Sequence, residues 1–472
     1  MMTPGNAALT RESGVTEAEI QEFRGHLRGQ LIAPDDADYD AARRVHNGMI
    51  DRYPRLIARC RDVADVIAAV NFGREKRLTI AVRSGGHNAA GLGTCDDGLV
   101  VDLSPMRGIR VDPVARTARV EGGCDWGDID HATHAFGLAT PSGFISTTGV
   151  GGLTLGGGIG NLTRGYGLTI DNLLAVDMVL ADGRFVTASG ADHQDLFWAV
   201  RGGGGNFGIV TSFEFRLHQI GTVYAGPMLW PMTQAEEVMR WYRDFIRVAP
   251  EALGGWFAFL KVPPGPPFPT ELHGQTMCGV VWCYTGPLEE AGATFAPIRR
   301  VGPPAVDFVG PLPFPAFQSM FDGLAPKGIN SYWRADFVTE LSDEAIARHV
   351  EHAAKLPTPQ STAHFYPIDG AAHRVGRNET AFSYRDANWA EVMVGFSPDA
   401  ADADLIKSWT IAYWDALHPH SAGGAYVNFM MDEGVDRIKA TYRDNYDRLV
   451  QIKNRYDPTN LFHVNQNIKP TI

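Results

Sequence analysis

The stretch R-S-G-G-H-N at Arg83–Asn88 places a histidine directly after two glycines. Two further glycine-dense stretches follow in the first half of the chain, at residues 149–160 and 202–208. Glycine tolerates positive φ and has no Cβ that would separate backbone N–H groups from a phosphate. We expect these stretches to be loops between regular elements, and three such loops in one half of a chain indicate a site for one large cofactor.

The third stretch tests an obvious alternative, a dinucleotide site of the Rossmann kind. Gly203, Gly205 and Gly208 fit the G-x-G-x-x-G spacing, but that fingerprint needs a strand before it and a helix after it. Residues 209–217 instead alternate as a strand does. The sequence also lacks the G-x-x-x-x-G-K-[ST] phosphate loop, so neither kind of nucleotide site is favoured.

Composition excludes several classes of protein. The chain has 472 residues, of which 54 are Asp or Glu and 42 are Lys or Arg, and its formal net charge is −12. This length predicts two domains, and an acidic chain without a Lys/Arg cluster is not expected to bind nucleic acid. No run approaches 18 uninterrupted apolar residues, so no membrane partner is expected.

Cysteine usage and the N-terminal region predict a reduced, cytoplasmic protein. The five cysteines are odd in number and none of them forms a C-x-x-C pair, so we expect neither a disulfide framework nor a metal site. Residues 1–34 carry charges throughout, without the apolar segment of a secretory signal.

Periodicity predicts the positions of the main helices and strands. Apolar residues at helical spacing mark ranges 62–76, 125–136, 343–355 and 403–417. Alternation or a short apolar run marks strands at 78–82, 98–103, 117–121, 174–180, 184–188, 209–217, 254–260 and 279–284. Beyond Leu217, proline-rich connectors at 262–269 and 303–315 bracket strands that are followed by helices. That order predicts an antiparallel sheet with a helical layer on one face.

Several motifs together resemble the berberine bridge enzyme-like branch of the vanillyl-alcohol-oxidase flavoprotein family. The first is R-S-G-G-H-N itself. The others are T-G-V-G-G-L-T-L-G-G-G-I-G at 148–160, R-G-Y-G-L at 164–168 with Tyr166 inside it, D-L-F-W-A-V-R-G-G-G-G-N-F-G at 195–208, and Y-D-P-T-N-L-F-H-V-N-Q-N-I at 456–468. The likeness runs from about residue 39 to residue 217 and returns at residues 426–468, while the middle of the chain is only loosely similar.

The resemblance implies a two-domain α+β fold with a PCMH-type FAD-binding domain. We expect that domain at residues 35–220, a substrate domain of antiparallel sheet covered by helices at 221–420, and a C-terminal segment at 421–472 that returns to the FAD domain.

His87 is the residue on which the resemblance places the cofactor. A neutral imidazole is a nucleophile near pH 7 and can bond to the 8-methyl carbon of the flavin; the alternative is a loop histidine that only hydrogen-bonds to backbone. Many relatives attach the flavin a second time through a cysteine, four residues before the G-x-G-G run. Ile145 stands at that place, so we expect FAD with a single covalent attachment.

The same resemblance supplies the remaining cofactor contacts. The glycine stretches are expected to present backbone N–H groups to the pyrophosphate, with amides of the C-terminal motif near the flavin or its ribityl chain. Thr148 stands at the position that controls access of O2 to the flavin in relatives. A side chain there of about the volume of Val, as Thr is, favours reaction with O2; the alternative is that Thr148 only caps a turn. The expected set is Arg83, Ser84, Gly85, Gly86, Asn88, Thr148, Gly149, Gly151, Gly152, Gly157, Gly158, Asn161, Gly205, Gly208, Val210, Asn465 and Asn467.

The catalytic base is less constrained. Several relatives end a Y-x-N-Y motif with a catalytic tyrosine, but this chain reads Tyr426-Val427-Asn428-Phe429, and Phe429 has no hydroxyl. Other relatives use a carboxylate on a neighbouring strand, a role that Glu391 in W-A-E-V-M-V would fill if burial raised its pKa toward neutrality. Glu391 could equally point outward on an edge strand. Tyr384, Tyr426 and Asn428 complete the candidate catalytic set.

These features predict an FAD-dependent oxidase. A substrate C–H would deliver a hydride to the flavin, a base would take a proton, and O2 would accept the electrons and become hydrogen peroxide. Expected substrates are small molecules that carry a sugar hydroxyl, another alcohol or an amine, and the protein is expected as a monomer or homodimer. Two alternatives remain open: a dehydrogenase with another electron acceptor, and a flavin-binding protein that has lost turnover.

Overall fold

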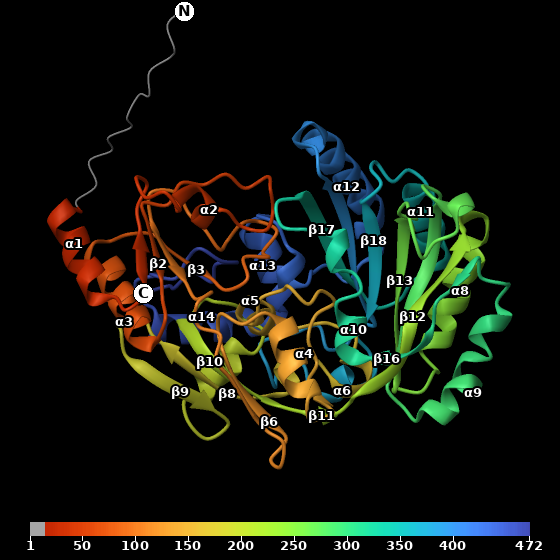
Figure 1. The fold of residues 1–472 in the computed structure, drawn as a ribbon, viewed down its shortest axis with the longest axis horizontal. Helices are drawn as coiled ribbons and strands as arrows, with labels where there is room; N and C mark the ends of the chain where they lie inside the picture. Colours follow the sequence, from red (N-terminus) through yellow and green to blue (C-terminus); the bar gives the residue numbers. More distant parts are fainter. Residues whose placement is uncertain (1–14) are drawn as a thin grey trace, which may run out of the picture.

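The computed structural model describes residues 15–472, which fold into two parts that lie side by side (Figure 1). Strands up to β11 (His218–Gln219) build the first part, and strands from β12 (Thr222–Pro231) to β19 (Trp389–Ser397) belong to one large sheet in the second. Near the end of the chain, α14 (Tyr446–Tyr456) packs against α7 (Gln194–Val200) of the first part. The C-terminal segment therefore returns to the half of the molecule in which the chain begins.

A small mixed sheet opens the first part, with the order β1-β2-β4-β3. Strands β2, β4 and β3 run parallel, and apolar side chains of α1 and α3 pack against them. The elements are α1 (Glu17–His26), β1 (Gln30–Ile32), α2 (Tyr39–Arg43), β2 (Leu56–Arg59), α3 (Val63–Glu75), β3 (Ile80–Arg83) and β4 (Leu99–Asp102). Because β3 ends at Arg83, the strand delivers the glycine-histidine stretch to the edge of this sheet.

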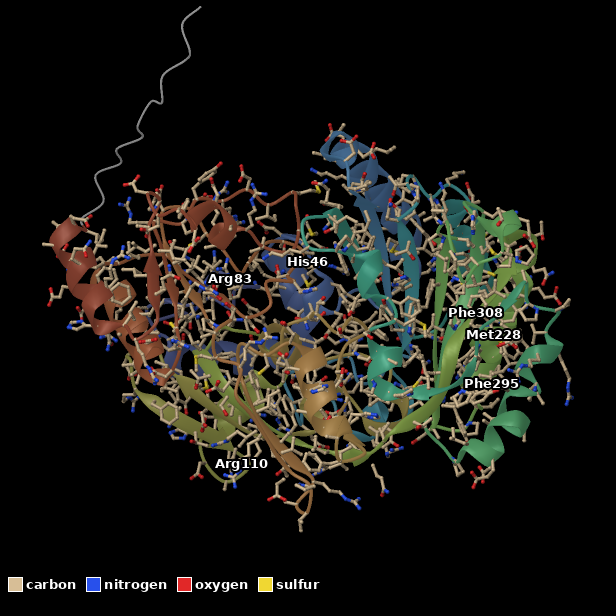
Figure 2. The ribbon with its side chains drawn as sticks, in the orientation of Figure 1. His46, Arg83, Arg110, Met228, Phe295 and Phe308 are labelled. Carbon is tan, nitrogen blue, oxygen red and sulfur yellow. The ribbon has the colours of Figure 1, made fainter. Side chains whose placement is uncertain are left out.

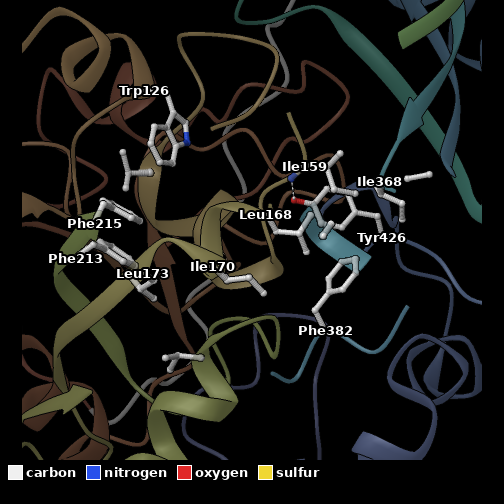
Figure 3. Packing of buried hydrophobic residues seen from close by; sticks show 14 of the residues in the cluster. Trp126, Ile159, Leu168, Ile170, Leu173, Phe213, Phe215, Ile368, Phe382 and Tyr426 are labelled. Atoms are coloured by element: carbon white, nitrogen blue, oxygen red, sulfur yellow. Dashed lines mark hydrogen bonds between the residues drawn. The ribbon is translucent and has the colours of Figure 1, made fainter. Parts of the chain in front are cut away.

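An antiparallel sheet with the order β5-β6-β10-β8-β9 completes the first part, and β7 pairs with β11 beside it. Its core contains Trp126, whose ring lies 5.6 Å from that of Phe215, and Phe213, which stacks on Phe215 (Figure 3). The strands are β5 (Ile109–Asp112), β6 (Thr117–Glu121), β7 (Leu138–Ala139), β8 (Leu173–Val179), β9 (Phe185–Ser189) and β10 (Ile209–Arg216); the helices are α4 (Trp126–His134), α5 (Val150–Gly156), α6 (Thr163–Tyr166) and α7. Since β10 directly follows Gly208, the prediction of a strand rather than a Rossmann helix is confirmed.

The second glycine stretch is a correction. We expected a loop between regular elements, but residues 150–156 form the helix α5. Glycine disfavours helices by about 1 kcal/mol per residue relative to alanine. Val150 and Thr154 are fully buried in this helix, and tertiary packing of this kind outweighs propensity in a short segment.

The second part is an antiparallel sheet in the order β15-β12-β14-β13-β18-β19-β17, with β16 beside β12. Its strands also include β13 (Leu253–Lys261), β14 (Thr276–Tyr284), β15 (Val306–Asp307), β16 (Gly310–Pro313), β17 (Asn330–Val338) and β18 (Thr362–Pro367). Its helices are α8 (Ala235–Ile246), α9 (Ala291–Phe295), α10 (Phe314–Gln318), α11 (Asp343–Ala353) and α12 (Ala403–Leu417), and α13 (Val435–Tyr442) precedes α14. The expected α+β architecture, with helices on one face of an antiparallel sheet, is confirmed.

The two faces of this sheet have different neighbours. Phe365 and Met393 lie in the core beneath α8, α11 and α12, together with Tyr413 and Ile346. Residues of the opposite face, such as Tyr366 and Val392, belong to the core that is shared with the first part of the molecule. Strand residues one apart point to opposite faces, so position along β18 or β19 decides which core a side chain enters.

Two features are absent from residues 15–472. None of the helices in this range is both long and apolar enough to cross a bilayer. Within the same range, no group of three or more His, Cys, Asp or Glu side chains is placed to bind a metal ion.

Candidate cofactor and substrate site

A cavity of about 310 Å³ lies between the two parts of the molecule. Its walls come from the loop after β3, from residues 143–155, from residues 204–210, from the C-terminal segment and from the inner face of the large sheet. Figure 2 shows His46, a lining residue, between Arg83 of the first part and the large sheet of the second. The three glycine stretches, far apart in sequence, all reach this one cavity.

Two of these stretches touch through their backbones. A Cβ at Gly85 would lie 2.5 Å from the backbone N of Gly149, and a Cβ at Gly149 would lie 2.2 Å from the backbone N of Gly85. Real Cβ atoms essentially never come so close to another heavy atom. Glycine is required at both positions so that the loop after β3 can meet the start of α5.

The contact leaves a cradle of unpaired donors around the cavity. Within residues 15–472, no protein acceptor takes the backbone N–H of residues 85–88, nor that of Gly149, Gly151, Gly152 or Gly205. All of these residues line the cavity, and Cβ atoms at Gly152 and Gly205 would meet open space. Backbone N–H groups that converge at a helix N-terminus suit an anionic ligand such as a pyrophosphate.

Side-chain polar atoms in the same region also lack partners. The buried Ser84 Oγ, Asn465 Oδ1 and Asn467 Oδ1 make no hydrogen bond to any described residue. Arg83 donates to Asp102 over 2.8 Å, but its second terminal nitrogen has no acceptor. Buried polar groups are normally satisfied, so these atoms fit a polar ligand that the protein alone does not supply.

His87 lies in the loop after β3, lines the cavity and is only partly buried. Its Nε2 is 3.2 Å from Thr147 Oγ1, and its ring centre is 3.9 Å from that of His46. Burial and the neighbouring His46 lower the pKa of His87 to about 3. The imidazole is therefore neutral near pH 7 and keeps a lone pair for bonding.

The C-terminal segment closes the cavity because it is tied to the third glycine stretch. Asn206 donates to the carbonyls of Gly203 and Gln466 and accepts from the backbone N–H of Ile468. Buried Lys453 donates to the Asn206 carbonyl, to the Phe462 carbonyl and to Asp457 Oδ2, each within 2.8 Å. These bonds hold Asn465 and Gln466 in the cavity wall, near Gly205, Gly208 and Val210.

Four expected cofactor residues lie outside the lining. Gly157 and Gly158 pass behind the cavity, where Gly158 N–H donates to Tyr426. Asn161 accepts from Trp256 Nε1 and donates to Gln318, beside a separate small cavity. Asn467 also lies outside the lining. The expected direct contact is thus unsupported for Gly157, Gly158 and Asn161, whose neighbours are other parts of the protein, whereas Asn467 keeps an unpartnered Oδ1 outside the lining.

Tyr426 and Asn428 line the cavity and hold the glycine stretch in place. The Tyr426 oxygen accepts hydrogen bonds from Gly158 N–H, from Ile159 N–H (Figure 3) and from Asn428 Nδ2 at 2.7 Å. Asn428 Nδ2 also donates to the Leu153 carbonyl. Burial raises the pKa of Tyr426 to about 12. With three donors directed at its oxygen, Tyr426 is occupied in positioning the backbone.

Glu391 is a correction, because the structure places it on the far face of the large sheet. It pairs across β18 with Phe365, whose ring lies in the core beneath the helices, and its Oε2 is 3.3 Å from His349 Nε2 of α11. Burial raises the pKa of Glu391, as we expected. Its carboxyl nevertheless points away from the cavity, since the residues of this strand that face the first part are Ala390, Val392 and Val394.

Tyr384 is a second correction. Its hydroxyl contacts the carbonyls of Ala422 and Ala440, its ring stacks on Phe337, and Arg443 lies 3.5 Å from the ring centre. It is absent from the cavity wall. Tyr384 packs the connection between the large sheet and α13, so its position does not allow contact with a ligand in the cavity.

Sequence reasoning missed the polar residues on the near face of the large sheet. Tyr366 and Ser331 line the cavity, and His364 contacts the Tyr366 hydroxyl. The signal was present in T-A-H-F-Y-P at residues 362–367, where alternate positions of a strand are polar or aromatic and therefore share one face. His46, from the loop after α2, carried no comparable pattern.

Comparison with known proteins agrees with this geometry. Residues 54–189 match the family model for the FAD binding domain, and residues 425–469 match the model for berberine and berberine-like proteins. An FAD-linked oxidoreductase of Dictyostelium discoideum is 34% identical over 98% of this chain and 98% of its own length. (R)-6-hydroxynicotine oxidase of Paenarthrobacter nicotinovorans is 28% identical over 94% of this chain and 97% of its own length.

Solved structures show the same architecture. The crystal structure of 6-hydroxy-D-nicotine oxidase from Arthrobacter nicotinovorans superimposes with a TM-score of 0.84 and 26% identity, over 94% of this chain and 98% of the other. A xylooligosaccharide oxidase from Myceliophthora thermophila in complex with xylobiose has a TM-score of 0.83 at 22% identity, and covers 96% of this chain and 99% of its own. The second likeness shows the fold alone.

Proposed function

Because this chain belongs to the berberine bridge enzyme-like FAD-linked oxidoreductases, we propose that it is an oxidase whose FAD is attached to His87 alone. The observation that carries the proposal is the neutral imidazole of His87, which lies in the same cavity as the cradle of unpaired backbone N–H groups. A nucleophile and an anion site in one cavity fit a cofactor that has a reactive ring system at one end and a pyrophosphate along its length.

The residues present fit FAD in character. The N–H groups of residues 85–88 and of Gly152 and Gly205 would hold the phosphates, and Leu103, Val210 and Phe462 give one end of the cavity an apolar wall that suits a flat base. When bound, the flavin supplies a two-electron acceptor for a hydride and passes the electrons to O2. Bond formation at His87 would remove the hydrogen of the ring N–H and one hydrogen of the methyl group, and O2 would take up these two protons and two electrons to become hydrogen peroxide.

A single attachment and reaction with O2 rest on two side chains of the same wall. Ile145 and Thr148 both line the cavity. An aliphatic Ile145 offers no sulfur for a second bond. The cysteine nearest to it in the sequence, Cys124, is fully buried and does not line the cavity. Thr148 is small enough to leave a path for O2 beside the flavin.

The cavity favours a neutral substrate. Arg83, which is paired with Asp102, is the one Arg, Lys, Asp or Glu side chain among the described residues of the lining. Without a carboxylate, the wall has nothing to pair with a protonated amine. Aromatic rings of Phe144, Trp333 and Tyr366 suit a flat ring or the apolar face of a sugar. Among the expected substrates, an alcohol or sugar hydroxyl is therefore favoured over an amine.

Anaerobic reduction of the holoprotein tests the proposal. The purified yellow protein would be mixed with a panel of 1-phenylethanol, benzyl alcohol, glucose, xylobiose and nicotine, and bleaching of the flavin absorbance followed. We expect an alcohol or sugar to bleach it, and admission of air to restore the colour with one hydrogen peroxide per flavin. Slow return of colour in air together with fast reduction would instead indicate a dehydrogenase, and no bleaching by any compound a flavin-binding protein.

A further inference from the structure

Three side chains of β18 lie on its cavity face in an alternating row: Thr362, His364 and Tyr366. Tyr366 lines the cavity, with its ring 4.0 Å from that of Phe144 and 5.7 Å from that of Phe429. Phe429, which replaces the last tyrosine of Y-x-N-Y, is thus next to the phenol of Tyr366, which comes from β18.

The three side chains form a continuous chain of hydrogen bonds. The Tyr366 hydroxyl lies 2.6 Å from His364 Nδ1, His364 Nε2 lies 2.8 Å from Thr362 Oγ1, and Thr362 Oγ1 lies 2.7 Å from the carbonyl of Phe259. All three distances are at the short end of the normal range.

The Phe259 carbonyl fixes the position of each proton. A carbonyl can only accept, so the Thr362 hydroxyl donates its one hydrogen to it. Thr362 must then accept from His364 Nε2–H, which leaves Nδ1 of the neutral ring as an acceptor. The Tyr366 hydroxyl therefore donates to His364 Nδ1, and no described residue donates a hydrogen bond to its oxygen.

The surroundings of His364 keep its imidazole neutral before the reaction. Burial lowers its pKa to about 3, and no charged side chain contributes to that shift. Its neighbours across the sheet are Ala258 and Val392, and the Trp256 ring packs on it at 4.9 Å. Tyr366 is the one titratable group in contact with it among the described residues, and burial raises the pKa of that phenol.

We propose that Tyr366 is the catalytic residue that accepts the substrate's hydroxyl proton, and that His364, held by Thr362, is the base behind it. This inference rests on the proposed oxidation of an alcohol. As the substrate C–H bond breaks and its electron pair leaves as hydride, the substrate O–H proton moves to the Tyr366 oxygen. The proton of Tyr366 moves to His364 Nδ1 at the same time, so the substrate becomes a carbonyl compound and His364 an imidazolium.

The charge balance favours this route over a tyrosine alone. A Tyr366 without an acceptor would have to hold two protons on one oxygen or begin as a buried phenolate, which its environment opposes. Burial opposes the imidazolium of His364 as well, but the hydride carries negative charge into the cavity at the same moment, and that charge offsets the cost of the cation. The Thr362 hydroxyl accepts from that cation just as it does from the neutral ring.

Anaerobic stopped-flow reduction of the holoprotein tests the relay, with the panel compound that bleaches the flavin fastest. Tyr366→Phe should slow flavin reduction by about 10²–10⁴-fold. His364→Gln should lose about as much, because its amide can accept the Tyr366 hydrogen bond but cannot take a proton. The wild-type rate should be level between pH 5 and 9, whereas the rates of both variants should rise with pH, as hydroxide or water becomes the acceptor.

Tyr413→Phe is the matched control. Tyr413 is a buried tyrosine whose hydroxyl lies 3.0 Å from His349 Nδ1, on the helix-covered face of the same sheet. The same hydroxyl is removed from the same kind of pair, so reduction should keep the wild-type rate and its level pH profile. A wild-type rate in Tyr366→Phe would overturn the proposal. A wild-type rate in His364→Gln alone would reduce His364 to a positioning residue.

A measurement without substrate keeps the relay testable if no panel compound reacts. In holoprotein with ¹⁵N-labelled histidine, His364 should be neutral at pH 7 with its proton on Nε2, and its Nδ1 signal should shift in Tyr366→Phe but not in Tyr413→Phe. A proton on Nδ1, or an imidazolium at pH 7, would contradict the relay. Failure of the whole panel would instead count against the proposed alcohol oxidation.

Discussion

Gly152→Ala should weaken cofactor binding without destabilising the fold. Gly152 lies in the first turn of α5 with its N–H unpaired, and a Cβ built on it meets nothing within 4 Å. In a helix, alanine is more favourable than glycine by about 0.5–1 kcal/mol, so the free energy of unfolding of the apoprotein should rise by that amount. In the holoprotein, however, the new methyl group would occupy space in the cavity beside the Gly152 N–H. A phosphate oxygen has to approach this N–H group to about 2.9 Å, so FAD binding should weaken.

Gly149→Ala gives the opposite combination. Its Cβ would lie 2.2 Å from the backbone N of Gly85, so the two loops would have to separate by roughly 1.2 Å to reach ordinary van der Waals contact. Overpacking of this kind costs about 1–3 kcal/mol. Gly149→Ala should therefore destabilise the apoprotein, whereas Gly152→Ala should not.

The assay combines urea unfolding of apoprotein with FAD titration. Binding is measured in a His87→Ala background, where no covalent bond can form and quenching of flavin fluorescence reports equilibrium affinity. We expect Gly152→Ala to weaken FAD binding at least about tenfold, or 1.4 kcal/mol. Gly190→Ala, exposed and without a neighbour within 4 Å, should leave affinity unchanged. Unaltered FAD affinity in Gly152→Ala would refute the assignment of the cradle.

Three further variants test other parts of the account. Thr148→Leu should slow reoxidation of the reduced flavin in air while anaerobic reduction stays near the wild-type rate, since the added bulk lies on the path proposed for O2; equal reoxidation rates would remove Thr148 from the argument. Glu391→Gln should leave flavin reduction within about twofold of wild type, unlike loss of a general base. Burial raises the pKa of Glu391 in the folded protein above its ordinary value of 4.5. The wild-type carboxyl therefore contributes stability that is fully present below pH 4.5 and is lost as pH rises through the folded-state pKa. Thermal melts of the glutamine variant at increasing pH should lack that loss of stability. Lys453→Met should cost about 3–5 kcal/mol in urea unfolding, because Asp457 is left buried and unpaired; a cost below about 1 kcal/mol would show that the C-terminal segment is held by other contacts.

Much of the fold could be predicted from the sequence, because local patterns agreed with the final structure. The strand at 209–217 was readable from alternation, and the helix at 62–76 from apolar spacing; both exist, with no end shifted by more than one residue. The helix α5 was not readable, since its glycines favour a loop and its stability comes from packing of Val150 and Thr154 in the core.

The site was readable only where a motif fixed its backbone. His87, Thr148 and Gly152 came from contiguous glycine stretches, and all line the cavity. Glu391 failed because the side that a strand residue faces depends on sheet register, which a lone strand does not reveal. The pair of His364 and Tyr366 is two residues apart in the sequence, but its importance depends on which face of β18 meets the first part of the molecule.

The site of flavin attachment tests the central claim most directly. The protein would be precipitated with acid, washed and digested, and the peptides analysed by mass spectrometry. The account predicts that the yellow colour stays in the precipitate, and that the mass of FAD is found on the peptide that contains His87 and on no cysteine peptide. Unmodified FAD released into the supernatant, with the His87 peptide at its unmodified mass, would contradict it.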